Sequence, residues 1–306
     1  LRIYGYNNVE IPTELKSSLT IAEEADKNYH RENIIGEQLV GAGFSEIMNN
    51  SLTKSSYYEE TGYNAYPWEE TVKVMNPLSA DLGVMRQTLL FGGLESIVRN
   101  VNRKAQNLRF FEVGNVYKFN KEKWSEESPV KAYSQDYHMA LWVTGKRIQG
   151  SWAHPDEEST FYELKAYVEN ILRRIGIAQG LLVSEKSDNN AFDKAITLKT
   201  RAGKVVVEMG ILSHKLLKSF DIDQKVYYAE LDWAGLMKAI RKNKLQFQEI
   251  SKYPAVSRDL ALLVDNNVEF AQIEEIARQT DKKLLKRVEL FDVYQGKNLP
   301  EGKKSY

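Results

Sequence analysis

The sequence predicts an α+β fold, in which an antiparallel sheet with helices forms a large first domain and a smaller module follows. Three observations support this prediction. Residues 196–200 and 204–208 are strand-like runs on either side of Arg201-Ala202-Gly203, which is the pattern of a β-hairpin. Apolar residues recur at helical spacing between positions 90 and 101. From residue 251 onward, the order strand, helix, strand and turn indicates a separate, smaller unit.

The composition limits the kinds of protein that this chain can be. Its 306 residues suffice for one large and one small domain, since single cores stop growing at roughly 250–300 residues. The 42 basic and 42 acidic side chains give no net charge, which argues against a strong autonomous RNA binder. The absence of cysteine excludes thiol catalysis, disulfides and thiolate metal sites. We find neither a signal peptide nor an apolar run near the roughly 20 residues of a membrane span, so we expect a cytoplasmic protein without membrane contact.

The first expected element is a helix that follows residues 1–19, which we interpret as the tail of an upstream domain and a linker. Thr20-Ile21-Ala22-Glu23 has the spacing of a capping box, and the helix is expected to run to about Ala42. Gly43 suits the left-handed position after a helix end. Residues 45–52 are then predicted to form a strand.

The next segment, residues 55–71, is polar and aromatic, with Tyr57, Tyr58, Tyr63, Tyr66 and Trp68. Stacking on nucleic-acid bases and packing on the protein's own core both remain open for these rings. A short strand at 72–75 and a helix at 89–101 follow. Four basic residues lie in or after this helix, and they either form a solvated face or meet phosphate or an acidic partner: Arg99, Arg103, Lys104 and Arg109.

Strand-like and helical patterns alternate through the rest of the large domain. The run 108–119 contains Gly114-Asn115 and is predicted to be a strand pair or a bulged strand. Residues 121–136 are expected to form an exposed loop and 137–145 a strand. A helix is expected at 162–175, and residues 227–236 are expected to lead from a strand into another helix.

The small module begins after a linker at 242–249. Residues 251–259 lead into a strand through Val264, and Asn267 is expected to cap a helix. Residues 288–294 are predicted to form a second strand, and 300–302 a turn.

Two charged residues in the run 108–119 have a spacing that matters for chemistry. Arg109 and Glu112 are three positions apart, and residues i and i+2 of a strand share a face. This spacing therefore places the two side chains on opposite faces of a regular strand.

Six phrases of the sequence resemble one known family when they are taken together and in order. They are Arg2-Ile3-Tyr4-Gly5-Tyr6-Asn7-Asn8, Gly43-Phe44-Ser45-Glu46, Asn76-Pro77-Leu78-Ser79, Val84-Met85-Arg86, Arg109-Phe110-Phe111-Glu112-Val113-Gly114 and Phe291-Asp292-Val293-Tyr294-Gln295-Gly296. Nearly the whole chain resembles the C-terminal half of the β subunit of bacterial phenylalanyl-tRNA synthetase.

The resemblance implies that residues 20–245 form a class II synthetase-like domain without catalysis and that 246–306 form a ferredoxin-like (βαββαβ) anticodon-binding domain. We expect the second domain to be incomplete, because the sequence stops at Tyr306 before a second helix and a fourth strand. Active class II enzymes carry Arg-x-Glu on the strand that corresponds to 108–119, where the arginine holds the ATP α-phosphate. Arg86, Arg109 and Glu112 are accordingly expected to be remnants of an active site, without a catalytic residue or a metal ligand.

The sequence departs from the family pattern at two places. Relatives often carry His-Pro-Gly before the predicted hairpin, where this chain has Ala191-Phe192-Asp193-Lys194. Active class II enzymes have a glycine-rich strand and an ATP-contacting arginine where this chain has residues 227–236. Gly235 is the one glycine there, and the first arginine after it is Arg241. Any role tied to those motifs is therefore in doubt.

The resemblance also implies partners: a catalytic α subunit in an (αβ)2 heterotetramer, and tRNA. ATP and Mg²⁺ are expected for the complete enzyme, with no cofactor in this part. The candidate tRNA contacts are Tyr253, Arg258, Lys282, Lys283, Lys286 and Arg287. The alternative for Tyr253 is core packing beside Pro254, and for each basic residue it is a solvated charge.

Two other functions remain open. A self-sufficient class II-like ATP-dependent ligase needs Mg²⁺ and arginines that stabilise the transferring charge, and Arg86 is the one well-placed candidate. An RNA-binding module without an enzymatic role is weakened by the zero net charge. ATP binding by the isolated chain separates the first of these from a non-catalytic subunit.

Overall fold

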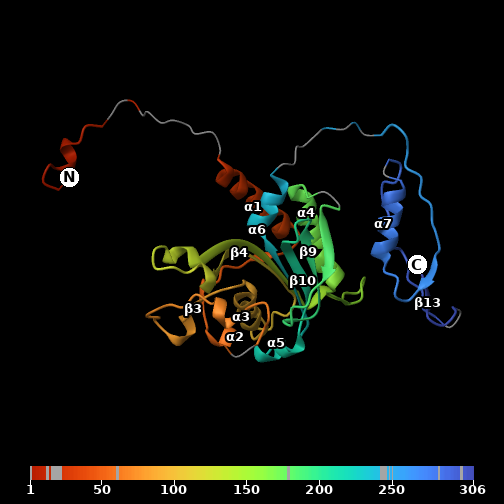
Figure 1. The fold of residues 1–306 in the computed structure, drawn as a ribbon, viewed down its shortest axis with the longest axis horizontal. Helices are drawn as coiled ribbons and strands as arrows, with labels where there is room; N and C mark the ends of the chain where they lie inside the picture. The colour runs from red at the N-terminus through yellow and green to blue at the C-terminus, as the bar shows by residue number, and fades with distance from the viewer. Residues whose placement is uncertain are drawn as a thin grey trace. The chain divides into compact units, whose positions relative to one another are not determined.

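A large sheet forms the centre of the first of two compact units, residues 1–244 and 245–306, in the computed structural model (Figure 1). The structure describes residues 2–11, 14, 23–59, 62–177, 180–241, 247, 249, 251–281, 283–296 and 299–306. Within these residues, seven strands pair in the order β1-β4-β5-β11-β10-β9-β8. Their bounds are β1 (Ser45–Glu46), β4 (Leu108–Phe119), β5 (Tyr133–Thr144), β8 (Leu182–Lys186), β9 (Phe192–Thr200), β10 (Val205–Leu212) and β11 (Val226–Asp232). Every pairing is antiparallel except that of β1 with β4.

Helices cover both faces of this sheet (Figure 1). One face packs on α1 (Glu24–Gly41), α4 (Phe161–Ile175) and α6 (Trp233–Ile240). The other packs on α2 (Ser56–Glu59), α3 (Leu90–Val101) and α5 (His214–Ser219). Alternate residues of β5 enter the two cores, because successive side chains of a strand point to opposite faces. Met139, Leu141 and Val143 pack on the first group of helices, while Ala140 and Trp142 pack on the second.

The predicted helices at 89–101 and 162–175 and the hairpin at 196–208 are confirmed by α3, α4 and the β9–β10 pair. The predicted bulge or strand pair in 108–119 is wrong, because β4 is one continuous strand that pairs with β5 without a register shift. The exposed loop predicted at 121–136 is also wrong at its end, since β5 already begins at Tyr133. Residues 133–136 are solvent-exposed, so no apolar alternation marks this part of the strand.

The start of the large domain differs from the prediction in two ways. Glu23 and Asp26, rather than Thr20 and Glu23, form the capping box of α1, and Thr20 lies outside the described residues. Gly43 has a φ of 87°, as expected after a helix end. The strand predicted at 45–52 is confirmed only at its start, where β1 pairs with β4. β1 ends at Glu46, and the chain leaves the sheet before β2 (Leu52–Thr53) pairs with β3 (Val84–Met85).

The smaller elements of this unit lie between the main strands. β6 (Lys146–Ile148) pairs with β7 (Glu157–Glu158) in a short hairpin after β5. Lys73, in the predicted strand 72–75, makes one isolated bridge to Val84. Single turns of 3₁₀-helix occur at η1 (Tyr6–Asn8), η2 (Trp68–Glu70), η3 (Ala80–Leu82), η4 (Lys121–Lys123) and η5 (Pro129–Ala132).

The second unit contains β12 (Leu263–Asp265), α7 (Phe270–Thr280) and β13 (Lys303–Ser305), and β12 pairs with β13. The capping box of α7 is formed by Glu269 and Gln272, so the predicted cap at Asn267 is wrong. The strand predicted at 288–294 is wrong as well, because its pairing is limited to one bridge from Tyr294 to Ser305. The turn predicted at 300–302 is confirmed by the bond from the Lys303 N–H to the Pro300 carbonyl. Most of the predicted linker at 242–249 lies outside the described residues.

No helix in the described part of the chain is both long and apolar enough to cross a membrane.

Candidate functional site

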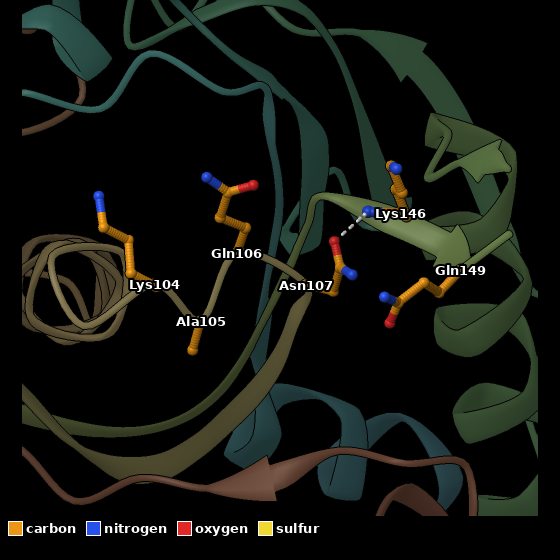
Figure 2. A pocket seen from close by; sticks show the side chains of 6 residues that line it. All are labelled: Lys104, Ala105, Gln106, Asn107, Lys146 and Gln149. Carbon is orange, nitrogen blue, oxygen red and sulfur yellow. Dashed lines mark hydrogen bonds between the residues drawn. The ribbon is translucent and has the colours of Figure 1, made fainter.

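A polar pocket of about 460 Å³ lies just after the end of α3 (Figure 2). It is lined by Lys104, Ala105, Gln106, Asn107, Lys146 and Gln149. The Lys146 N–H donates to the Asn107 side chain at 2.8 Å, and the Lys146 ammonium pairs with Asp156 at 2.6 Å. These linings offer amide and ammonium groups, which can hold a polar group through hydrogen bonds.

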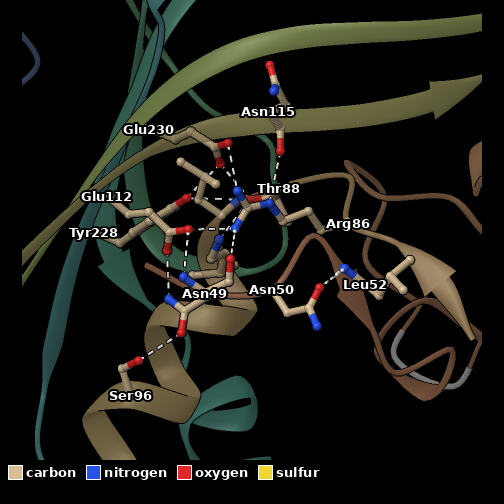
Figure 3. A network of polar contacts seen from close by, with 12 residues as sticks. Asn49, Asn50, Leu52, Arg86, Thr88, Ser96, Glu112, Asn115, Tyr228 and Glu230 are labelled. Carbon is tan, nitrogen blue, oxygen red and sulfur yellow. Dashed lines mark hydrogen bonds and ion pairs between the residues drawn. The ribbon is translucent and has the colours of Figure 1, made fainter. Parts of the chain in front are cut away.

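A buried ion pair marks the second candidate site, on the α3 side of the sheet (Figure 3). Arg86 Nη1 lies 2.6 Å from Glu112 Oε1, and the two side chains are 8% and 1% exposed. Arg86 also donates from Nε to the Asn115 carbonyl at 2.9 Å. Glu112 accepts from the backbone and side-chain amides of Asn49 at 3.1 and 2.6 Å. Both charges are thus neutralised and hydrogen-bonded within the protein, which a buried pair requires.

The local sequence explains why this pair can form. Arg86 follows β3 directly, and its carbonyl accepts from the Tyr117 N–H of β4 at 2.8 Å, so the two segments lie side by side. Gly114 is two residues after Glu112 on the same face of β4. A Cβ at Gly114 would lie 2.3 Å from Arg86 Nη2. A side chain at this position would therefore displace the guanidinium from its place across the strand.

A second buried carboxylate, Glu230 of β11, lies in the same network (Figure 3). It accepts from the hydroxyls of Thr88 and Tyr228 at 2.5 and 2.6 Å, and His138 Nδ1 lies 2.8 Å away. Because the Leu89 N–H also points to Glu230, at 3.4 Å, this carboxylate holds the start of α3 on the sheet.

The pKa values of this network depend on burial and on the pairing of Glu230 with His138. Burial raises the pKa of Glu230, but the hydrogen bonds from His138, Thr88 and Tyr228 and the His138 charge outweigh it. The pKa of Glu230 is therefore below its usual value. Burial likewise lowers the pKa of His138, while the bond to Glu230 and its charge raise it above 6.5 overall. The sequence reasoning missed His138 and Glu230, because they are 92 positions apart and meet only through strand pairing.

Arg109 does not join this network. Its Nη2 lies 3.0 Å from Glu163 Oε1 of α4 and donates to the Arg147 carbonyl at 3.1 Å, on the α1, α4 and α6 side of the sheet. The prediction that Arg109 and Glu112 lie on opposite faces is thereby confirmed. Of the three predicted remnants, the fold brings Arg86 and Glu112 together and leaves Arg109 apart.

The residues present do not fit an ATP·Mg²⁺ clamp. Arg86 has its guanidinium engaged by protein groups, and Arg109 faces the other side of the sheet. The strand-to-helix step from β11 to α6 is capped by Asp232, which accepts from the Gly235 N–H at 2.7 Å. Within the residues that the structure describes, no cluster of three or more His, Asp or Glu side chains could hold a metal ion.

The aromatic segment 55–71 packs on its own domain. Tyr57, Tyr58, Tyr63 and Tyr66 surround Phe91 of α3, with ring centroids 4.9, 5.4, 6.3 and 5.9 Å from it. The packing interpretation is confirmed for these four rings, and base stacking by them is wrong.

The candidate tRNA contacts of the second unit lie at its surface. Tyr253 is 84% exposed, so the alternative of core packing beside Pro254 is wrong. Arg258, Lys283, Lys286 and Arg287 are exposed, and Arg287 forms an ion pair with Glu289. Lys282 lies outside the described residues. Exposure leaves these side chains accessible, and their role in tRNA binding stays a prediction.

Both parts of the chain match known protein families. Residues 11–233 match "Phenylalanyl tRNA synthetase beta chain CLM domain", and residues 251–306 match "Ferredoxin-fold anticodon binding domain". The class that these matches define is the aminoacyl-tRNA synthetases. The chain belongs to the family of phenylalanyl-tRNA synthetase β chains.

Curated relatives show the same similarity along the whole chain. The chain is 58% identical to the phenylalanine–tRNA ligase β subunit of Bacteroides thetaiotaomicron, 49% to that of Porphyromonas gingivalis and 30% to that of Bacillus licheniformis. These alignments cover 99 or 100% of this chain but 36 or 37% of each relative. The chain thus spans little more than a third of the length of these relatives.

Proposed function

We propose that this chain is the C-terminal part of a β subunit of phenylalanine–tRNA ligase, which charges tRNA with phenylalanine using ATP and Mg²⁺ in the cytoplasm. The observation that carries this proposal is the match of both modules, in order, over nearly all of the 306 residues. Residues 20–245 are the synthetase-like domain and residues 246–306 the anticodon-binding domain.

The first domain serves assembly rather than adenylation. The resemblance to class II synthetases implies a catalytic architecture for its sheet and helices, whereas Arg86 and Glu112, the expected remnants of the active site, bind each other. Without the chemistry, the packed core and the surface of this domain remain available for binding another subunit. A catalytic α subunit therefore performs adenylation, and this domain binds that subunit in an (αβ)2 assembly. The competing self-sufficient ligase lacks a free arginine at the corresponding place.

The second domain docks tRNA through its exposed residues. Tyr253 can stack on an unpaired base, a contact worth about 1–3 kcal/mol. Arg258, Lys283, Lys286 and Arg287 can hold phosphates, which makes binding depend on salt. Lys282 belongs to the same basic segment in the sequence.

Co-expression of the complete β subunit with its α subunit tests the assembly. An obligate interface buries roughly 2,000 Å² or more, so the two subunits should co-purify through salt washing. Light scattering should give the mass of two α and two β subunits. Separate elution of two folded subunits would contradict the proposal, and a single αβ pair would contradict its stoichiometry.

A further inference from the structure

The β6–β7 hairpin, residues 145–159, is fixed to the large domain at its base. The Ser159 N–H donates to the Gly145 carbonyl at 3.0 Å, which closes the hairpin. Arg109 of β4 donates to the Arg147 carbonyl at 3.1 Å, which holds its first strand. Gly145 has a φ of 80°, a conformation in which glycine lets the chain turn out of β5.

The tip of this hairpin is an ordered turn. The Ser151 N–H donates to the His154 carbonyl at 2.9 Å, and the Ala153 N–H donates to Ser151 Oγ at 3.3 Å. Asp156 accepts from the Gly150 N–H, and a Cβ at Gly150 would lie 2.8 Å from Asp156 Oδ1. The backbone on both sides of Trp152 is therefore held in place.

Trp152, inside this turn, is 100% exposed. Tryptophan is enriched among the residues that dominate protein–protein binding, and burying a large aromatic side chain removes about 150–250 Å² from water. Ile148 on the same hairpin is 39% exposed, and Tyr162, shortly after the hairpin, is 78% exposed. Because the turn that carries Trp152 is already ordered, little conformational freedom is lost on binding, which favours affinity.

The charges of the hairpin favour a protein partner over RNA. Lys146 pairs with Asp156 at 2.6 Å, and Arg147 pairs with Glu157 at 3.1 Å. Glu158 adds a third acidic residue, so the hairpin carries two basic and three acidic side chains. RNA binding depends on cations that replace counterions at phosphates, and this hairpin has both of its cations neutralised internally.

We infer that Trp152 is the anchor of a protein–protein interface and that its occupant is the α subunit, which receives the indole in an apolar pocket. The inference rests on the proposed function, in which the β subunit has a lasting protein partner. Other parts of the β subunit and tRNA are the competing occupants.

Affinity measurements on complete subunits test this inference. The dissociation constant of labelled α subunit is measured for wild-type β and for Trp152→Ala, Trp152→Phe and Trp124→Ala. Trp124 is 50% exposed in the η4–η5 segment and serves as the matched control for loss of an exposed indole. Trp152→Ala should weaken α binding about 30-fold or more, as expected for an anchor residue. Trp152→Phe should retain most of the affinity, and Trp124→Ala should leave it unchanged.

Five outcomes would overturn the inference. α binding by Trp152→Ala within about twofold of wild type shows that the indole is no anchor. Equal weakening by Trp124→Ala shows an effect that is not specific to the hairpin. Lower tRNA affinity with unchanged α binding assigns Trp152 to RNA, and a lower melting temperature of the free Trp152→Ala β subunit assigns it to packing within β. If wild-type β itself fails to bind α, the proposed function fails, and the inference fails with it.

Discussion

At the scale of single residues, the ion pair between Arg86 and Glu112 has the clearest consequences. Sequence reasoning correctly separated Arg109 from Glu112, because that result follows from the period of a strand alone. It did not predict that Arg86 meets Glu112, since the two lie 26 positions apart and are joined by tertiary packing. Gly114 was the available signal, because a glycine inside a strand often marks the close approach of another group.

Removing one partner of this pair should destabilise the large domain strongly. We expect Arg86→Ala to lower the free energy of unfolding by about 3–5 kcal/mol, because it leaves the Glu112 charge buried without its partner. The double variant Arg86→Met, Glu112→Leu should lose much less, since both charges are replaced by apolar groups. Urea unfolding followed by circular dichroism measures both. Similar stability of Arg86→Ala and wild type would show that the pair is not held as described.

The pair of His138 and Glu230 should make stability depend on pH. Because the pKa of His138 is raised on folding, its stabilisation of the folded protein is complete below pH 6.5 and is lost as pH rises through the pKa of the folded state. Because the pKa of Glu230 is lowered on folding, its stabilisation is present above pH 4.5 and is lost as pH falls through the pKa of the folded state. The pair therefore stabilises the folded protein most between pH 4.5 and pH 6.5.

Unfolding experiments from about pH 5 to about pH 9 test this dependence around the histidine reference value. Wild type should lose stability on the alkaline side, and His138→Gln should lose less of it over the same range. The same alkaline slope in both proteins would contradict the assignment to His138.

At the scale of elements, strong local patterns predicted helices and strands correctly, whereas elements that depend on tertiary context were not predicted. α3, α4 and the β9–β10 hairpin were predicted because amphipathic spacing and a glycine-containing turn can be recognised in the local sequence. The strand expected at 45–52 ends early at Glu46, and the Asn49 N–H then donates to the Glu112 side chain rather than to the backbone of β4. The strand expected at 288–294 fails because its pairing is limited to one bridge.

The packing of α3 on β5 provides a test at this scale. A Cβ at Gly93 of α3 would lie 2.1 Å from the Trp142 ring, whereas a Cβ at Gly41 of α1 would meet nothing within 4 Å. Gly93→Ala should therefore lower stability by about 1–3 kcal/mol through overpacking. Gly41→Ala, the matched control, should be neutral or slightly stabilising. Equal stability of the two variants would contradict the close packing of this helix.

The basic segment after α7 is expected to contribute to tRNA binding as a group. Replacing Lys282, Lys283, Lys286 and Arg287 by alanine in the complete β subunit should weaken tRNA binding by the holoenzyme. For each phosphate that is no longer neutralised, the log–log slope of affinity against salt should become shallower by about 0.7–0.9, with adenylate formation unchanged. Replacing Lys121, Lys123, Lys131 and Lys215, which are exposed in the first unit, removes four positive charges as well and is the control for the change in net charge. Unchanged tRNA affinity at low salt would show that the segment is only a solvated surface.

At the scale of the whole molecule, the chain consists of two compact units, and each of them matches a known domain family. The similarity of the whole chain to its relatives was predicted from six short phrases, because they occur in the expected order and at suitable distances in this sequence. The fact that protein groups occupy the charged side chains of the expected ATP site could be predicted only in part. Spacing excluded Arg109 as a clamp, but the engagement of Arg86 depends on how β3 and β4 come together.

Amino-acid-dependent pyrophosphate exchange tests the central claim most directly. The assay compares the purified chain, the complete αβ enzyme and the complete enzyme carrying Arg86→Met, Glu112→Leu. We predict no exchange by the chain alone and equal exchange by the two complete enzymes, because the Arg86–Glu112 pair holds the fold and does not touch ATP. Exchange by the chain alone that is abolished by Arg86→Ala would contradict the account.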